Sequence, residues 1–148
     1  MERNIAKWLE ELKSNFPDLD LLPAASLEVL RKTEEEVGKL PANLAKVLEA
    51  SNGLTCRSFR LLSALDPSNP KKTWESLQRA NDPKKSDALG RANELHERFL
   101  VFADIGNGYA MFDREDQTIW FAESGDTEIQ QTDLSFEEFI SVMLERAE

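Results

Sequence analysis

The sequence predicts a single α+β domain in which an antiparallel sheet carries helices packed mainly on one face. Three amphipathic segments fill the first third of the chain, a strand meander lies between residues 99 and 123, and one further amphipathic segment follows. Helices and strands in successive blocks favour an antiparallel sheet, because a parallel sheet needs a crossover between strands. With 148 residues, 41% of them hydrophobic, the chain is long enough to bury one core.

The first helix is predicted over residues 3–16, where apolar side chains recur at helical spacing, and Pro17 ends it. Residues 18–25 are predicted to be a connection. Residues 1–25 therefore form an N-terminal helix and connection within a single domain that spans residues 1–148. No linker separates two segments that are each large enough for a core of their own.

Two more helices follow, and capping residues mark their ends. Ser26 is the predicted N-cap of the second helix, which ends at Gly38, a residue that tolerates the left-handed conformation of a helix end. Pro41 suits the first position of the third helix, and Asn52-Gly53 provides the turn that ends it. The buried stripe of the third helix is formed by Leu44, Val47 and Leu48.

A strand and a polar excursion are predicted in the middle of the chain. Residues 57–65 mix apolar and polar side chains in near alternation, which predicts a short half-buried strand. Residues 66–89, rich in Pro, Asn, Asp, Ser and Lys, form a polar excursion that holds one short helix around Trp74, Leu77 and Ala80.

Three strands in succession are predicted between residues 99 and 123, because aromatic and β-branched side chains fill three runs separated by polar turns. Residues 106–108, Gly-Asn-Gly, are predicted to supply the positive φ angles of a tight turn, and residues 113–117 a polar hairpin loop. Since both faces of the first strand are apolar, we expect that strand in the centre of the sheet.

An edge strand and a helix are predicted near the end of the sequence. A short stretch at residues 128–130 suits a further edge strand. Ser135 and Glu138 have the spacing of a capping box, and Leu134 and Phe139 can form a hydrophobic staple around it. The helix that follows carries apolar residues on one side, so we expect it to pack back on the sheet.

The negative charge is concentrated in the last third of the chain. The formal net charge is −10 at pH 7, yet residues 1–103 hold 16 acidic and 16 basic side chains, whereas residues 104–148 hold 12 acidic and two basic ones. Acidic residues at strand ends and turns cannot be core residues, and their summed field attracts a cationic protein. A solubilising coat is the alternative. The predicted docking anions are Asp113, Glu115, Asp116, Glu123, Asp126 and Glu128.

Few residues are suited to catalysis or metal binding. A single Cys (Cys56) and a single His (His96) exclude an intramolecular disulfide and multi-cysteine or multi-histidine metal sites. Residues 105–109 lack the lysine and the helix of a phosphate-binding loop, and residues 113–116 lack the glycine and the distal glutamate of a calcium loop. We expect a half-buried structural Cys56 and a surface or helix-end His96. The sequence thus predicts no catalytic residue, no metal and no cofactor.

The composition also limits the partners and the compartment. A strongly acidic protein is repelled by phosphate backbones and anionic lipid, so we expect neither direct nucleic acid binding nor membrane contact. No apolar run approaches the roughly 20 residues that span a bilayer, and nothing marks export. One cysteine suits a reducing compartment, and we expect a cytoplasmic protein. The sequence carries no signal for an oligomeric state.

Two of the three tryptophans are candidate partner contacts. Trp120 lies in the last strand of the meander, and Trp74 stands in the polar excursion with little local reason to be buried. Loop tryptophans mostly dock on their own domain, so packing is favoured for Trp74, although the residue type is enriched at interface hot spots. Trp74 and Trp120 complete the set of predicted protein-binding residues.

Several short motifs in a fixed order resemble the SUKH superfamily over roughly residues 26–146. They are Val37-Gly38, Leu40-Pro41, Leu44 to Leu48, Ser51-Asn52-Gly53, Phe99 to Asp104, Gly106-Asn107-Gly108, Phe112-Asp113, Ile119-Trp120 and the helix from Ser135. The resemblance implies a single α+β domain and binding in place of catalysis. Bacterial members of that superfamily are regarded as immunity proteins that neutralise cognate toxins, frequently nucleases, and fungal relatives as regulators of cell-wall synthesis. The excursion at residues 66–89 and the first helix fall outside the motifs.

Together these observations predict a bacterial immunity-type protein that blocks a cognate toxin with a basic surface, without catalysis. A nuclease fits that description, because its cleft must be positive to attract phosphates. The alternative is a regulatory scaffold or a small-ligand or peptide-sensing domain that uses Tyr109, Trp120 and Trp74 as contacts. Hydrolase or transferase activity is disfavoured by the shortage of catalytic side chains.

Overall fold

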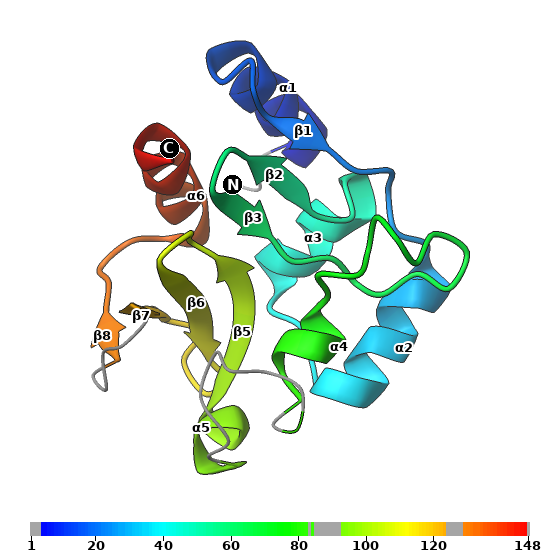
Figure 1. Ribbon diagram of the computed structural model, residues 1–148, viewed down its shortest axis with the longest axis vertical. Coiled ribbons are helices and arrows are strands. Elements are labelled where there is room, and N and C mark those ends of the chain that lie inside the picture. Colours follow the sequence, from blue (N-terminus) through cyan, green and yellow to red (C-terminus); the bar gives the residue numbers. More distant parts are fainter. Residues whose placement is uncertain (1–3, 83, 85–92, 124–128, 148) are drawn as a thin grey trace.

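The computed structural model describes residues 4–82, 84, 93–123 and 129–147. The helices are α1 (Ile5–Asn15), α2 (Leu27–Val37), α3 (Ala42–Ala50), α4 (Leu77–Ala80), α5 (Asn93–Arg98) and α6 (Phe136–Arg146). The strands are β1 (Asp20–Leu21), β2 (Leu54–Cys56), β3 (Phe59–Leu61), β5 (Phe99–Asp104), β6 (Gly108–Asp113), β7 (Ile119–Glu123) and β8 (Gln130–Gln131). They form one antiparallel sheet in the order β1-β2-β3-β5-β6-β7-β8, which confirms the α+β class (Figure 1).

The helices of the first third begin and end close to the predicted residues. Asn4 caps α1, and the Ser26 hydroxyl accepts a hydrogen bond from the Val29 N–H at the start of α2. Gly38 ends α2 with a φ of 94°, where a side chain is strained. Pro41 lies one position before α3, as its N-cap. Local capping chemistry therefore sets these boundaries.

Two short strands in this region were not predicted. Residues 18–25 contain β1, whose Asp20 and Leu21 pair with Thr55 and Leu54 of β2. The strand expected over residues 57–65 is correct only for β3, because Arg57, at a φ of 54°, lies in the turn between β2 and β3. The strand β1 depends on a distant partner, so no local pattern marks it, whereas β2 pairs with β3 across the adjacent turn and is too short to show an alternating pattern.

The predicted meander of β5, β6 and β7 is present, and β5 lies in the middle of the sheet with its first five residues buried. In the turn between β5 and β6 only Gly106 has a positive φ, of 95°. The expectation of positive φ at Asn107 and Gly108 was wrong. Gly108 lies in β6, where a Cβ atom would collide with the carbonyl oxygen of Ala122 on β7. Close strand approach, not turn conformation, therefore requires glycine at this position.

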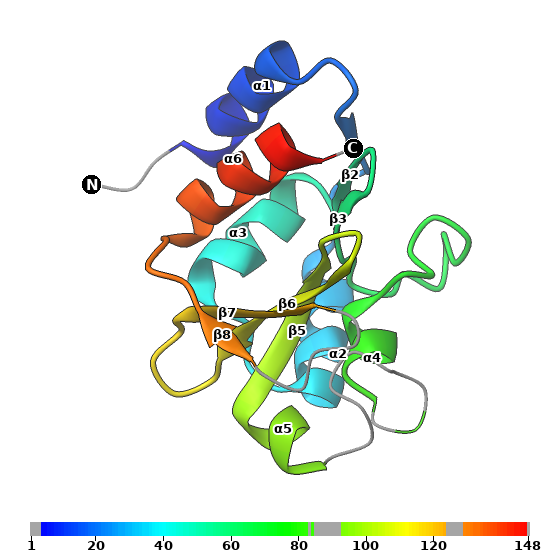
Figure 2. The same cartoon turned by 60° about the vertical axis from the view of Figure 1, so that its left-hand side comes forward.

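The core forms where α6 packs on β5 and β6. The ring of Phe102 on β5 lies 4.3 Å from that of Phe112 and 5.8 Å from those of Phe136 and Phe139 on α6, measured between centroids. The predicted capping box at Ser135 is present at the start of α6. Figure 2 shows α1, α3 and α6 together on one side of β6 and β7. The last helix thus packs back on the sheet as expected.

Two asparagine side chains extend the hydrogen bonding of the sheet. Asn52 accepts from the Ala64 N–H (2.8 Å) and donates to the Ala64 carbonyl (2.9 Å). Asn81, just after α4, accepts from the Val101 N–H and donates to the Val101 carbonyl, both at 2.8 Å. Each amide thus takes the place that a neighbouring strand would occupy.

The excursion holds one short helix, α4, as predicted; its residues 83 and 85–89 lie outside the described residues.

Candidate functional site

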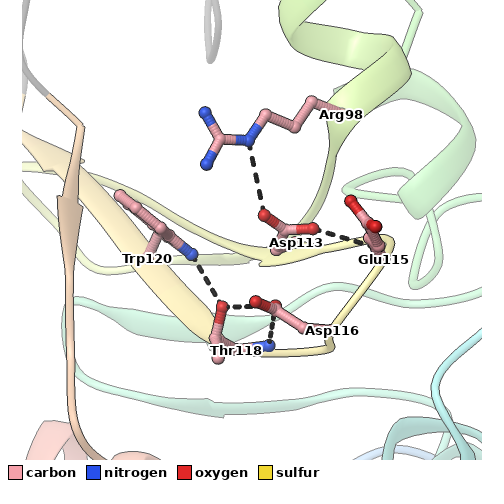
Figure 3. A network of polar contacts seen from close by, with 6 residues as sticks. All are labelled: Arg98, Asp113, Glu115, Asp116, Thr118 and Trp120. Carbon is pink, nitrogen blue, oxygen red and sulfur yellow. Dashed lines mark hydrogen bonds and ion pairs between the residues drawn. The ribbon is translucent and has the colours of Figure 1, made fainter.

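The acidic turn, residues 113–117, runs from the last residue of β6 towards β7. It holds three of the predicted docking anions, and Figure 3 shows its polar contacts. Asp113 is only 7% exposed, which corrects the expectation that the acidic residues of the turns lie outside the core. Its carboxylate accepts from Nε of Arg98 at 3.3 Å and from the Glu115 N–H at 2.9 Å. Asp113 therefore shapes the turn, and its charge is balanced by that of Arg98.

Arg98 is held by aromatic rings as well as by Asp113. Its guanidinium carbon lies 4.7 Å from the ring centroid of Phe99 and 5.0 Å from that of Trp120. The two rings are themselves 5.6 Å apart. A guanidinium over aromatic faces is attracted by their quadrupoles and keeps fewer conformations. Trp120 is thus brought together with the acidic turn, as the prediction of one binding surface requires.

Asp116 and Trp120 are linked through Thr118. One carboxylate oxygen of Asp116 accepts from the Thr118 hydroxyl (2.6 Å) and from the Thr118 N–H (2.9 Å), and the indole N–H of Trp120 donates to the same hydroxyl oxygen (2.8 Å). The hydroxyl donor, followed by the N–H, lowers the pKa of Asp116. Asp116 is exposed, so this network positions an ionised carboxylate towards solvent.

Arg114 ties the acidic turn to the end of α2. Its guanidinium donates to the Val37 carbonyl (2.6 Å) and to the His96 carbonyl (3.2 Å). Desolvation lowers the pKa of Arg114. A cation is favourable at a helix C-terminus, where carbonyls lack partners. Arg114 is one of the two basic residues in positions 104–148, and its charge is directed inward.

The end of α2 adds acidic residues that the charge count by segment did not single out. Glu35 and Glu36 are exposed in its last turn. They were hidden in the count because residues 1–103 are neutral overall. The contact between Arg114 and Val37 places this helix end beside the turn at 113–117. The helix end and the acidic turn are therefore neighbours in the fold.

Glu123, the remaining predicted anion that the structure describes, is not brought to this turn. Glu123 is exposed at the far end of β7, about 16 Å along the strand from Thr118 at a rise of about 3.3 Å per residue. There it lines a groove of about 740 Å³ with Arg146 of α6. None of Tyr109, Trp120 and Trp74 lines this groove. Asp126 and Glu128 lie outside the described residues.

Trp74 is 58% exposed, and the expectation that it packs on its own domain was wrong. The guanidinium carbon of Arg79 lies 4.7 Å from its ring centroid. The ring borders a second hollow of about 770 Å³. The other residues that line this hollow are Glu36, Val37, Leu65, Ser76, Gln78, Arg79, Asn81 and Asp82. Trp74 is thus separate from the Trp120 network, although Val37 contacts both regions.

The other candidate groups have structural surroundings. Cys56 is buried, and desolvation raises the pKa of its thiol, so it is a structural cysteine more buried than expected. His96 lies in the last turn of α5, as the helix-end expectation had it, but it is buried, which corrects the expectation of a surface position. Among the described residues no group of three or more His, Cys, Asp or Glu is placed to bind a metal ion. Within the same residues no helix is long and apolar enough to cross a membrane.

Comparisons with known proteins connect this arrangement to a family. The comparison with curated proteins finds no match. A family model described as SMI1 / KNR4 family (SUKH-1) matches residues 24–142, which include the acidic turn and the Trp74 hollow but not α1. The match supports a role of the toxin-immunity type or a related regulatory role. The chain therefore belongs to the SMI1/KNR4 family (SUKH-1), in agreement with its resemblance to the SUKH superfamily.

Proposed function

We propose that this protein binds and neutralises a cognate bacterial toxin, and that the acidic turn is the docking surface. Its exposed anions are Glu115 and Asp116. Within the described part of the chain neither nearby arginine forms an ion pair with them, because Arg98 is paired with Asp113 and Arg114 donates to main-chain carbonyls. This commitment of both arginines is the observation that carries the proposal. It leaves a fixed negative charge directed towards solvent.

A nuclease is the toxin class that such a surface suits best. An enzyme that binds phosphates needs a positive cleft, and an anionic protein that occupies the cleft competes for the same field. Inhibition then needs no catalytic group on the immunity protein. The proposal places the protein in the bacterial cytoplasm, where an immunity protein meets a toxin that acts on nucleic acid.

Rigidity is the second support for the proposal. Asp116 is fixed by Thr118, and Trp120 is fixed by Thr118 and by Arg98. Side chains that are ordered before binding lose less conformational entropy when a partner docks. A tryptophan beside an ordered anion also provides the apolar contact typical of an interface hot spot. On this proposal, Asp116 and Trp120 need little rearrangement when the partner docks.

The test uses the product of a neighbouring reading frame that ends in a basic domain, purified as an inactive variant. Association with the wild-type protein and with Glu115→Gln/Asp116→Asn is followed by stopped flow at several salt concentrations. We expect association of the double variant to be about five- to tenfold slower at low salt, with a flatter salt dependence and little change in dissociation rate.

A matched control removes two charges elsewhere. Glu10 and Glu11 are exposed on α1, outside the family match, so Glu10→Gln/Glu11→Gln changes the net charge equally. We expect it to slow association much less. If both double variants slow it equally, only net charge matters and the acidic turn is not the docking surface. If the basic protein does not bind, and co-expression does not rescue growth from the active toxin, the immunity role is wrong for this pair.

A further inference from the structure

Trp74 is exposed on a rigid support. Thr73 is buried, and its hydroxyl donates to the Asn69 carbonyl (2.8 Å) and accepts from the Asp66 N–H (3.0 Å). On the other side, the Ser63 N–H donates to the Glu75 carbonyl and the Leu77 N–H donates to the Ser63 carbonyl. The main chain on both sides of Trp74 is thus fixed. A large aromatic ring held in solvent forgoes the free energy of burial, which a partner can recover.

Two side-chain amides that line the hollow beside Trp74 already have hydrogen-bond partners within the protein. The Gln78 amide accepts from the Leu65 N–H (3.1 Å) and donates to the Thr33 hydroxyl (2.8 Å). The Asn81 amide is bonded to the main chain of Val101. These amides are therefore fixed in place. A ligand of the hollow would be recognised by the apolar side chains and the charged groups that line it.

Two acidic residues, Glu36 and Asp82, line the hollow together with one basic residue, Arg79, whose guanidinium lies against the Trp74 ring. Glu36 is exposed at the end of α2 and makes no ion pair within the described part of the chain. Asp82, half-buried, uses one oxygen to accept from the Lys84 N–H. The apolar side chains that line the same hollow are Trp74, Val37 and Leu65. An apolar wall with carboxylates at its rim is complementary to an aliphatic stem that ends in a cation.

We propose that this hollow receives a lysine or arginine side chain of the partner protein. The methylene groups pack on Trp74 and Val37, and the cationic group lies between the carboxylates of Glu36 and Asp82. Arg79, 4.7 Å from the Trp74 centroid, shows that the ring already accepts a guanidinium on one face. An acidic side chain in the same place would be repelled by both carboxylates.

The inference rests on the proposed function for the identity of the partner and names a second contact with it. The hollow adjoins the acidic turn through Val37, which lines the hollow and whose carbonyl accepts from Arg114. A basic protein surface that meets Glu115 and Asp116 can therefore also reach Glu36. Two anchors on one face explain why the exposed tryptophan lies beside an acidic helix end.

The experiment uses a pentapeptide probe with one central arginine between glycines, capped at both ends, and an analogue in which citrulline replaces arginine. Citrulline has nearly the same shape and no charge. The peptides are titrated into the ¹⁵N-labelled full chain, and the indole N–H signal of Trp74, assigned with Trp74→Phe, is followed by NMR. We expect saturable shifts of this signal with the arginine peptide and an affinity about fivefold lower with the citrulline peptide.

Matched variants localise the binding. Glu36→Gln is expected to weaken the arginine peptide about fivefold at the Trp74 signal, whereas Glu28→Gln, the same change in the first turn of α2, leaves it unchanged. The inference is overturned if the Trp74 signal does not move, if citrulline binds as well as arginine, if both variants weaken binding equally, or if a peptide with central glutamate binds better.

The two proposals fail separately. The Glu115→Gln/Asp116→Asn variant keeps the hollow intact, so its Trp74 titration with the arginine peptide is expected to match that of the wild type. Loss of toxin association with an unchanged peptide titration supports both sites. Peptide binding without any toxin association supports the proposal for the hollow and contradicts the immunity role for this pair. Toxin association without peptide binding contradicts only the proposal for the hollow.

Discussion

At the scale of single residues, Asn52 joins the two segments that flank the β2–β3 hairpin. Its side chain bonds both main-chain groups of Ala64, and its carbonyl accepts from the Ser63 hydroxyl (2.7 Å). Gly53 beside it has a φ of 100°, and a Cβ atom there would lie 2.5 Å from the Ser63 hydroxyl oxygen. The Ser51-Asn52-Gly53 motif, part of the family resemblance, is therefore a structural clamp.

Removal of this clamp is predicted to be costly. Asn52→Ala leaves the N–H and carbonyl of Ala64 buried without their partner, and each such group costs about 1–3 kcal/mol, so the free energy of unfolding is expected to fall by about 2–4 kcal/mol. Urea unfolding followed by circular dichroism measures it. Asn43→Ala on an exposed position of α3 is the control and is expected to change stability little. Equal effects would show that the clamp does not matter.

Two aspartates of the same turn have different roles because their surroundings differ. Asp113 is buried and balanced by Arg98, whereas Asp116 is exposed and bonded by neutral donors of Thr118. Neutral donors hold a carboxylate in place without cancelling its charge. The turn thus uses the charge of one aspartate in its structure and leaves the charge of the other exposed to solvent.

At the scale of elements, α2 ends in an arrangement that opposes its own dipole. Its last turn contains acidic residues and no basic one, although a helix C-terminus favours cations. The Glu34 carboxylate accepts from the N–H of Leu40, just beyond the helix (2.9 Å). Arg114, from the turn between β6 and β7, supplies the cation that the last turn of α2 lacks. The contact with the acidic turn therefore stabilises the helix end.

Arg114→Met tests this dependence. The variant keeps most of the side-chain volume and removes charge-assisted hydrogen bonds to Val37 and His96, so we expect a loss of about 2–3 kcal/mol in unfolding free energy. The matched control is Arg146→Met, which removes the other basic charge of positions 104–148 from an exposed site and is expected to stay within about 0.5 kcal/mol. Chemical denaturation of both variants measures the difference, and similar losses would contradict the role of Arg114.

At the scale of the whole molecule, stability depends on pH through three separate carboxyls. The pKa of Asp66 is lowered mainly by the Ser68 hydroxyl, that of Asp116 by the Thr118 hydroxyl, and that of Glu138 by the Ser135 N–H of the capping box. Each folded-state pKa lies below its unfolded value. The resulting stability is present above the unfolded pKa and is lost as the pH falls through the folded one.

We therefore expect the urea midpoint to fall as the pH is lowered from about 4.5 to 3, where these carboxyls protonate. A variant with Asp66→Asn, Asp116→Asn and Glu138→Gln is expected to be less stable at pH 7 and to lose less over the same interval. The measurement is a series of urea titrations across this range. Parallel curves for the two proteins would show that these carboxyls do not contribute to the pH dependence.

The local signals predicted most of the fold but only part of the site. Caps and periodicity identified α2 and α6, because Ser26, Gly38 and the Ser135 capping box act within one helical turn. The strand β1 was missed because it pairs only with a distant segment, whereas β2, which forms a hairpin with β3, was missed because three residues are too few to show an alternating pattern. The burial of Asp113 was missed for the same reason, because Arg98 and the aromatic rings beside it come from other elements.

The exposure of Trp74 agrees with its polar surroundings in the sequence, and the general tendency of loop tryptophans to pack on their own domain led to the wrong prediction. Its neighbours Thr73 and Leu77 are buried, and a sequence pattern does not say which member of such a segment faces solvent. The acidic end of α2 was visible as a run of glutamates, but its importance follows only from its contact with Arg114. Electrostatic sites built from several elements therefore require the tertiary structure.

The hydrogen bonds that hold the polar excursion to the rest of the fold have a practical consequence for protein engineering. The main-chain bridge between Ser63 and Ser76 closes one end, and the Asn81 amide on Val101 secures the chain after α4. The Ser63–Ser76 bridge closes the loop of residues 64–75, so this loop leaves and rejoins the fold at neighbouring points. A change in its length is therefore expected to leave the seven strands aligned and to alter the support of Trp74, which depends on Asp66, Asn69 and Thr73.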